Sequence, residues 1–155
     1  DDGNWLPEIN LSNLTRHYVY RYKPELAYNA LLAYIKWSDI RKQDHYFAPE
    51  YAAQICRQFT NLEQYDRAIS AGELAVELAN QKQDSRDRLL PYYFLGKAYM
   101  MSGQHLDKAR KLLEAAYQIA DHRAGYNDYR MMEPAAALLA ELDKKEGKKA
   151  VVRPQ

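Results

Sequence analysis

The chain has 155 residues, of which 47% are hydrophobic, and its 22 Lys and Arg residues nearly balance its 21 Asp and Glu residues. The net charge of +1 gives no general attraction to nucleic acid or anionic lipid, so neither is expected as a partner. No apolar run approaches the ~20 residues that cross a bilayer, and we expect a soluble protein, cytoplasmic or periplasmic, without membrane insertion. The chain starts at Asp1 rather than Met, which fits a processed protein and a segment of a longer one equally well.

A motif recurs along the chain with a period of about 41 residues. The stretch LTRHYVYRYKPELA at 14–27 aligns with ICRQFTNLEQYDRA at 55–68, and LGKAYMMSGQHLDKA at 95–109 is a third copy with one extra residue in its turn. A shortened fourth copy, LAELDKKEGKKA, follows at 139–150. Such self-similarity is typical of helical arrays in which each unit packs only on its neighbours.

Each unit predicts two amphipathic helices joined by a turn. In the second unit, Ile55 and Phe59 lie at helical spacing, a turn follows at 62–65, and Ala68 and Gly72 begin a stripe of small residues on the next helix. Small side chains along one stripe let two helix backbones approach closely. The sequence therefore predicts hairpins that pack through alanine and glycine.

The third copy resembles the tetratricopeptide repeat (TPR). Its segment YYFLGKAYMMSGQHLDKARKLLEAAYQIAD carries, in the order of that family's pattern, Tyr92, Leu95, Gly96, Tyr99, Gly103, Ala109, Leu113 and Ala116. The second unit is similar and the first is weaker, because Thr15 replaces the small residue and Pro24 the turn aromatic. The resemblance implies an all-α fold, a TPR-like α-solenoid of three helix-turn-helix repeats plus a C-terminal capping helix.

The expected organisation is one array with short flanking segments. Residues 1–10 are an N-terminal extension, residues 11–147 are the array, and residues 148–155 are a tail or linker. The predicted repeats cover about 11–46, 49–88 and 89–125, and the capping helix covers about 131–147.

The repeat unit is longer than the family's usual length of about 34 residues. The extra residues amount to about two helical turns, and they fall in the charged segments 38–49 and 79–89. We therefore expect longer helices whose ends stand out into solvent, similar to the repeats of kinesin light chains. Pro49, Pro91 and Pro134 suit the first turn of a helix, where a missing N–H has no cost.

The residues that usually carry chemistry are scattered. The four histidines, His17, His45, His105 and His122, form no pair at metal-ligand spacing, and no nucleotide-binding or nucleophile-elbow motif is present. Cys56, the only cysteine, occupies a small-residue position of the repeat, which favours a buried and inert thiol. The sequence predicts a protein that is not an enzyme and uses no metal or cofactor.

The family resemblance also implies a binding surface, because the first helix of each TPR unit lines a concave groove. The corresponding position holds Arg16, Arg57 and Lys97 in the three units, which predicts a basic stripe. The partner-binding residues expected in this groove are Arg16, Tyr20, Arg57, Asn61, Tyr93, Lys97, Met100 and Met101. Such a groove suits an acidic peptide with apolar anchors. The alternative is that the cations are an ordinary solvated face and the methionines fill the core.

These sequence features are compatible with two functions. The first is a non-catalytic protein–protein interaction scaffold that binds a peptide or partner segment in its concave groove. The alternative is a structural or self-associating spacer segment of a larger multidomain protein, possibly of the bacterial envelope. The charged end KKEGKKAVVRPQ resembles a linker, and a homo-oligomer is compatible with this second function.

Overall fold

The computed structural model describes residues 6–121, 128–148 and 151–153. Within these residues the chain is all-helical, as predicted, and contains no strand. The α-helices are α1 (Leu6–Tyr20), α2 (Pro24–Ile40), α3 (Ala48–Asn61), α4 (Tyr65–Asn80), α5 (Leu89–Ser102), α6 (Leu106–Asp121) and α7 (Met132–Lys145), with short 3-10 helices η1 (Ser85–Arg88) and η2 (Asp128–Met131).

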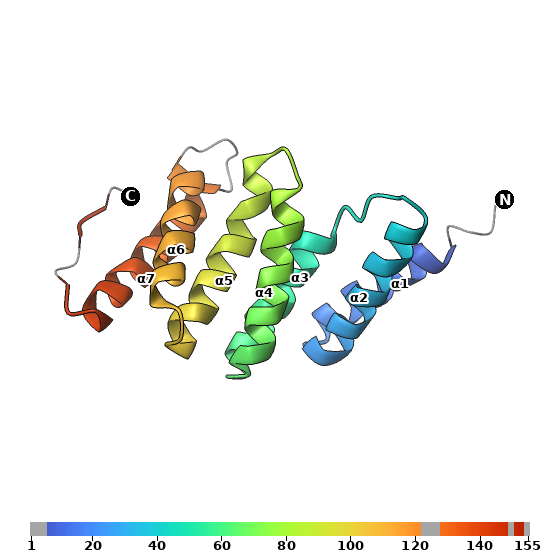
Figure 1. Cartoon of the computed structure of the whole chain (residues 1–155), viewed down its shortest axis with the longest axis horizontal. Coiled ribbons are helices and arrows are strands. Elements are labelled where there is room, and N and C mark those ends of the chain that lie inside the picture. The colour runs from blue at the N-terminus through green and yellow to red at the C-terminus, as the bar shows by residue number, and fades with distance from the viewer. Residues whose placement is uncertain (1–5, 122–127, 149–150, 154–155) are drawn as a thin grey trace.

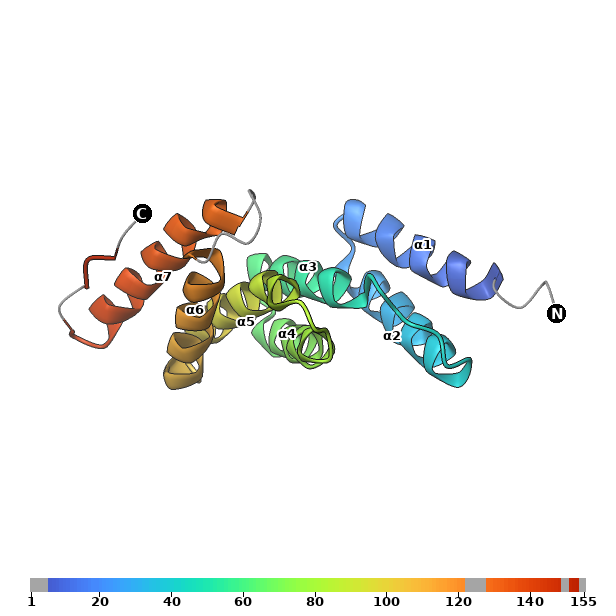
Figure 2. The same cartoon turned by 90° about the horizontal axis from the view of Figure 1, so that it is seen from above.

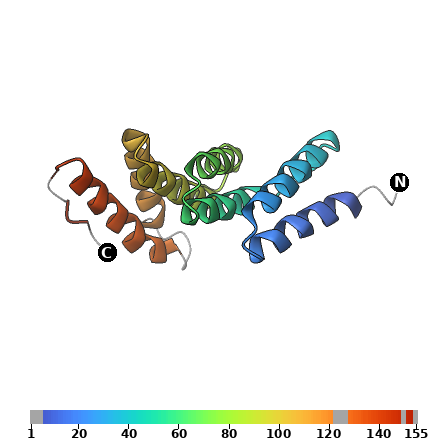
Figure 3. The same cartoon turned by 90° about the horizontal axis from the view of Figure 1, so that it is seen from below.

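The helices stand side by side in chain order, and each packs on its neighbours (Figure 1). Seen from above, α2, α4 and α6 lie along one side of the row, and α1 and α7 stand out on the other side, with α3 and α5 between them (Figure 2). The view from below shows the same curvature, so the row has a concave side that the first helices of the hairpins line (Figure 3). The fold is an all-α helical repeat, as the sequence predicts.

The hairpin turns repeat at atomic detail. Tyr22, Glu63 and Gly103, just after α1, α3 and α5, all adopt left-handed backbone conformations with φ of 55°, 59° and 72°. One turn into each following helix comes a fully buried alanine, and its N–H donates to the carbonyl oxygen four residues earlier. These bonds are Ala27 to Lys23 at 2.9 Å, Ala68 to Gln64 at 2.9 Å and Ala109 to His105 at 2.8 Å. The three units therefore share one turn geometry and one buried anchor.

Small residues set how closely the helices approach. A Cβ atom added to Gly72 of α4 would lie 2.7 Å from Cδ1 of Leu95 in α5 and 2.9 Å from Sγ of Cys56 in α3. A Cβ atom on Gly96 of α5 would lie 2.9 Å from Cγ of Leu113 in α6. All three distances are shorter than real Cβ contacts, so at these glycines the side chains of the neighbouring helices lie directly against the helix backbone. The predicted small-residue stripe is confirmed.

The expectation of longer helices is wrong. Helix α2 ends at Ile40, where Lys42 adopts φ of 54° and the N–H of Gln43 donates to the carbonyl of Ser38 at 2.9 Å. This left-handed cap closes the helix as a C-terminal glycine would. Helix α4 ends at Asn80, and Asp84 then accepts a bond from the N–H of Arg86 at 2.9 Å and so begins η1. The extra residues of each unit thus form connecting segments, 41–47 and 81–88, between helices of ordinary length.

The predicted segment boundaries near the two ends of the chain differ from the observed helix bounds or fall outside the described residues. Helix α1 begins at Leu6, so it includes the last part of the predicted 1–10 extension, and residues 1–5 lie outside the described residues. The predicted end of the third repeat near 125, His122 and parts of the 148–155 tail also lie outside them.

The C-terminal helix is fixed by an ion-pair cluster. Asp143 of α7 is buried, and its carboxylate lies 2.7 Å from the guanidinium of Arg110 in α6, which also pairs with Glu146 at 2.8 Å. Burial alone would raise the pKa of Asp143, but the hydrogen bonds from Arg110 and from the N–H of Val151 outweigh it, and the pKa is lowered. Helix α7 also packs the buried residues Met132, Ala135 and Leu139 into the core beside α6.

We expect Gly72→Val to lower the free energy of unfolding by about 1–3 kcal/mol, because the new side chain would overlap Leu95 and Cys56. The measurement is urea unfolding followed by circular dichroism at 222 nm. Ser70→Val on the same helix is the control, and since Ser70 is exposed its effect should stay within about 0.5 kcal/mol. Equal stability of the two variants would contradict the close contact between α4 and α5.

Candidate functional site

A groove of about 460 Å³ runs between α1 and α3 on the concave side. It contains four of the predicted partner-binding residues, Arg16, Tyr20, Arg57 and Asn61. Helix α3 packs closely against α5 but only lightly against α1, and this difference leaves the space open. We call this hollow the α1–α3 groove.

At the floor of the α1–α3 groove, one side chain links the two helices by a hydrogen bond. Gln58 of α3 is only 8% exposed, and its Nε2 donates to the carbonyl oxygen of Val19 in α1 at 2.8 Å. Its Oε1 is buried and has no hydrogen-bond partner among the described residues. The bond holds α1 at a fixed distance from α3 and leaves one unused acceptor beneath the groove.

Two guanidinium groups dominate the charge of the groove. Arg16 and Arg57 are exposed, and neither forms an ion pair within the described part of the chain, although Arg57 lies 3.5 Å from Oε1 of Gln54. Glu50 is the one carboxylate among the described residues that line the groove. An anionic group entering the groove would therefore meet two cations whose hydrogen-bonding capacity is largely unused.

Arg57 is held in place by aromatic neighbours on α5. Its Cζ lies 5.9 Å from the ring centroid of Phe94, within the range of a cation–π contact. Burial raises the pKa of the Tyr93 hydroxyl, and the nearby charge of Arg57 partly offsets that rise. The guanidinium therefore lies at the junction of α3 and α5, facing the α1–α3 groove.

The other side chains that line the groove are polar and uncharged or aromatic. Ser12, Asn13 and Gln54 supply hydroxyl and amide groups, and Tyr22, Phe47 and Tyr51 supply rings, in addition to the residues above. Sequence reasoning missed these six. For Asn13 and Gln54 a pattern was available, because each lies three residues before the arginine of its unit, on the same helix face.

The partner-binding residues predicted on α5 do not line the α1–α3 groove. Met100 is fully buried in the core beside Leu95 and Tyr99, so its prediction as a groove residue is wrong and the core-filling alternative holds for it. Tyr93 is only 8% exposed and lies beneath Arg57 rather than in the lining. Lys97 is partly buried and Met101 is exposed, and neither lines the α1–α3 groove. The basic stripe is thus a pair of arginines in one groove, with Lys97 outside it.

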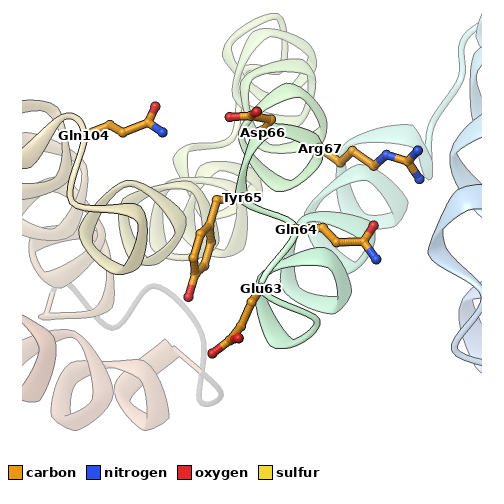
Figure 4. Close-up of a pocket in the computed structure, with 6 residues that line it drawn as sticks. All are labelled: Glu63, Gln64, Tyr65, Asp66, Arg67 and Gln104. Carbon is orange, nitrogen blue, oxygen red and sulfur yellow. The ribbon is translucent and has the colours of Figure 1, made fainter.

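A larger hollow of about 580 Å³ lies at the hairpin turns. Its lining is Glu63 and Gln64 of the α3–α4 turn, Tyr65, Asp66 and Arg67 in the first turn of α4, and Gln104 of the α5–α6 turn. Figure 4 shows these side chains pointing in different directions: Tyr65 and Glu63 point downward, whereas Arg67 extends to the right, away from Gln104. Because the polar groups do not converge, this hollow has no arrangement for holding one ligand.

The groups that could carry chemistry lie apart from the α1–α3 groove. Cys56 is fully buried, and burial raises the pKa of its thiol to about 12, although a hydrogen bond with Thr60 partly opposes this. Its Sγ lies 3.5 Å from the carbonyl oxygen of Phe94. Among the described residues, no group of histidine, cysteine and carboxylate side chains is placed to hold a metal ion. None of the helices described is both long enough and apolar enough to cross a bilayer.

A scan of known family models matches none of them to this chain, and searches of curated proteins and of solved structures likewise find no match. The function is therefore inferred from the repeat geometry and from the α1–α3 groove.

We expect Cys56 to resist thiol reagents in the folded protein. The thiol is inaccessible and remains protonated near pH 8, since its pKa is about 12, and thiolate is the reactive form. The measurement is release of thionitrobenzoate from Ellman's reagent at pH 8, with and without guanidinium chloride. Rapid reaction should appear only in denaturant, and rapid reaction in buffer would contradict the buried position.

Proposed function

We propose that this protein is a non-catalytic interaction module that binds an extended, acidic peptide segment of a partner protein in the α1–α3 groove. The observation that carries the proposal is the pair Arg16 and Arg57, exposed, without an ion pair in the described structure, and facing a groove with one carboxylate. Guanidinium groups bind carboxylates with paired, charge-assisted hydrogen bonds. A single partner segment with acidic side chains would satisfy both arginines.

The amide side chains support a peptide rather than a small anion. Asn13, Gln54 and Asn61 each offer donors and an acceptor, which match the N–H and C=O groups of an extended main chain. The rings of Tyr20, Tyr22 and Tyr51 offer apolar surface for intervening side chains. This lining also supports the assignment of the array as TPR-like, in which the first helix of each unit faces the ligand.

Charge reversal of Arg57 tests this proposal. Twelve-residue peptides would be selected from a random phage-displayed library on the immobilised protein, and their affinities measured by fluorescence anisotropy. We expect Arg57→Glu to weaken binding of the selected peptides about 10- to 100-fold, the loss for a charged hydrogen-bonded contact. Arg57 is exposed, so helical content should not change.

Lys111→Glu is the matched control, because Lys111 is an exposed cation of α6 away from the groove. It changes the net charge by the same amount as Arg57→Glu. If Lys111→Glu weakens binding of the selected peptides as much as Arg57→Glu does, the attraction is a general charge effect. If neither variant weakens binding, the α1–α3 groove is not the site.

A second candidate function is self-association through the first hairpin. Most of the large apolar side chains that are exposed in the described structure lie between residues 14 and 47, whereas α7 exposes none. On α2, Leu26, Ala33 and Ile40 recur every seven residues on the exposed side of the helix, which is the spacing of a helix–helix seam. Exposed apolar side chains at this spacing suit a helix–helix contact with a second copy of the chain.

We expect, under this second candidate, a dimer that dissociates on dilution and is abolished by Leu26→Lys with Ile40→Lys. The measurement is sedimentation velocity over a range of concentrations. Leu62→Lys is the control, since Leu62 is also exposed but lies at the α3–α4 turn. A monomer at every concentration would exclude self-association by this face.

A further inference from the structure

A third, smaller hollow of about 170 Å³ lies where the N-terminal ends of α3 and α5 meet the segments that precede them. Its apolar lining is Tyr46, Pro49, Leu90 and Pro91. Two of its lining residues, Phe47 and Glu50, also line the α1–α3 groove. The two hollows therefore adjoin at the start of α3, and we call the smaller one the Tyr46 hollow.

A row of rings connects the two hollows. The ring centroids of Tyr51 and Phe47 lie 6.0 Å apart, and those of Phe47 and Tyr46 lie 5.0 Å apart with an interplanar angle of 89°. Tyr46 is 67% exposed and Phe47 is 48% exposed, so large aromatic faces are left in solvent. Aromatic side chains prefer such edge-to-face and offset arrangements, and another ring can extend the row.

The two cations that line the Tyr46 hollow are already paired, and its lining also includes the carboxylates of Glu50 and Asp87. Nζ of Lys82 lies 3.2 Å from Asp44 and 5.1 Å from the centroid of the Tyr46 ring, which it supports from one side. Arg86 pairs with Asp84 at 2.8 Å. This differs from the α1–α3 groove, where both arginines have no ion pair within the described structure. The Tyr46 hollow therefore does not suit a carboxylate, and its exposed rings favour an aromatic side chain.

We propose that the partner peptide continues beyond the α1–α3 groove, crosses Phe47 and places an aromatic residue in the Tyr46 hollow. This inference rests on the proposed function and adds a second element to the recognised motif, an aromatic residue at one end of an acidic segment. The acidic part contacts Arg16 and Arg57. The aromatic residue packs against Tyr46, between Pro49 and Pro91.

The test uses the peptide with the highest affinity selected from the twelve-residue library, labelled with fluorescein. Its affinity is measured for the unmodified protein, for Tyr46→Ala and for Leu62→Ala. Leu62 is the matched control, because it is also exposed, at 55%, but lies at the α3–α4 turn outside both hollows. We expect the peptide to contain an aromatic residue, and Tyr46→Ala to weaken binding about five- to twentyfold with no change for Leu62→Ala.

A second variant on the peptide side identifies the contact. Replacing the peptide's aromatic residue with alanine should weaken binding to the unmodified protein by a similar factor. The same replacement should have little further effect on binding to Tyr46→Ala, because the two changes remove one contact. If the two changes instead weaken the affinity independently, so that their factors multiply in the combined case, the placement of that residue against Tyr46 is overturned.

The failures of the two proposals are distinguishable. If Arg57→Glu abolishes binding while Tyr46→Ala and Leu62→Ala both bind as the unmodified protein does, the extension is overturned and the α1–α3 groove stands. If the library gives no peptide whose binding depends on Arg57, both proposals fall. Binding of fluorescein-labelled oligouridine that depends on Tyr46, without such a peptide, would also overturn the extension and would identify single-stranded RNA as the occupant.

Discussion

The close approach of helices at small residues is the constraint from which the rest of this structure follows. Ala27, Ala68 and Ala109 are fully buried at the same point of three hairpins, and Gly72 has no room for a Cβ atom. Because each hairpin closes in the same way, the first helices of successive units face the same side of the array. This repetition brings Arg16 and Arg57 into one groove, although they are far apart in the chain.

The groove exists because the packing is not uniform along the array. Where α3 meets α5, Tyr93 and Phe94 of α5 lie next to Arg57 and are nearly fully buried. Between α1 and α3 the main link on the floor is the hydrogen bond from Gln58 to Val19, and the space above it stays open. The weaker packing of α1 against α3 is therefore what leaves the candidate site open.

The sequence predicts the repeat well because the repeat depends on local features: helical spacing, turn position and alanine or glycine at contacts. It does not predict Met100, because α5 is apolar around most of its circumference and its spacing does not separate the core side from the groove side. It also misses Tyr46 and Phe47, which lie in the connecting segment 41–47, outside the repeating pattern. Their positions depend on where α2 ends, and the left-handed conformation at Lys42 that ends it has no glycine to mark it.

The most direct test of the stacked-hairpin arrangement is cross-linking without any partner. In a Cys56→Ala background, cysteines replace Arg16 and Arg57, and a short bismaleimide is added to dilute protein. We predict rapid intramolecular cross-linking, because both positions line one groove, and none when the cysteines replace Arg16 and Lys111, which lies on α6. Equal cross-linking of the two pairs, or none for Arg16 and Arg57, would contradict the common face.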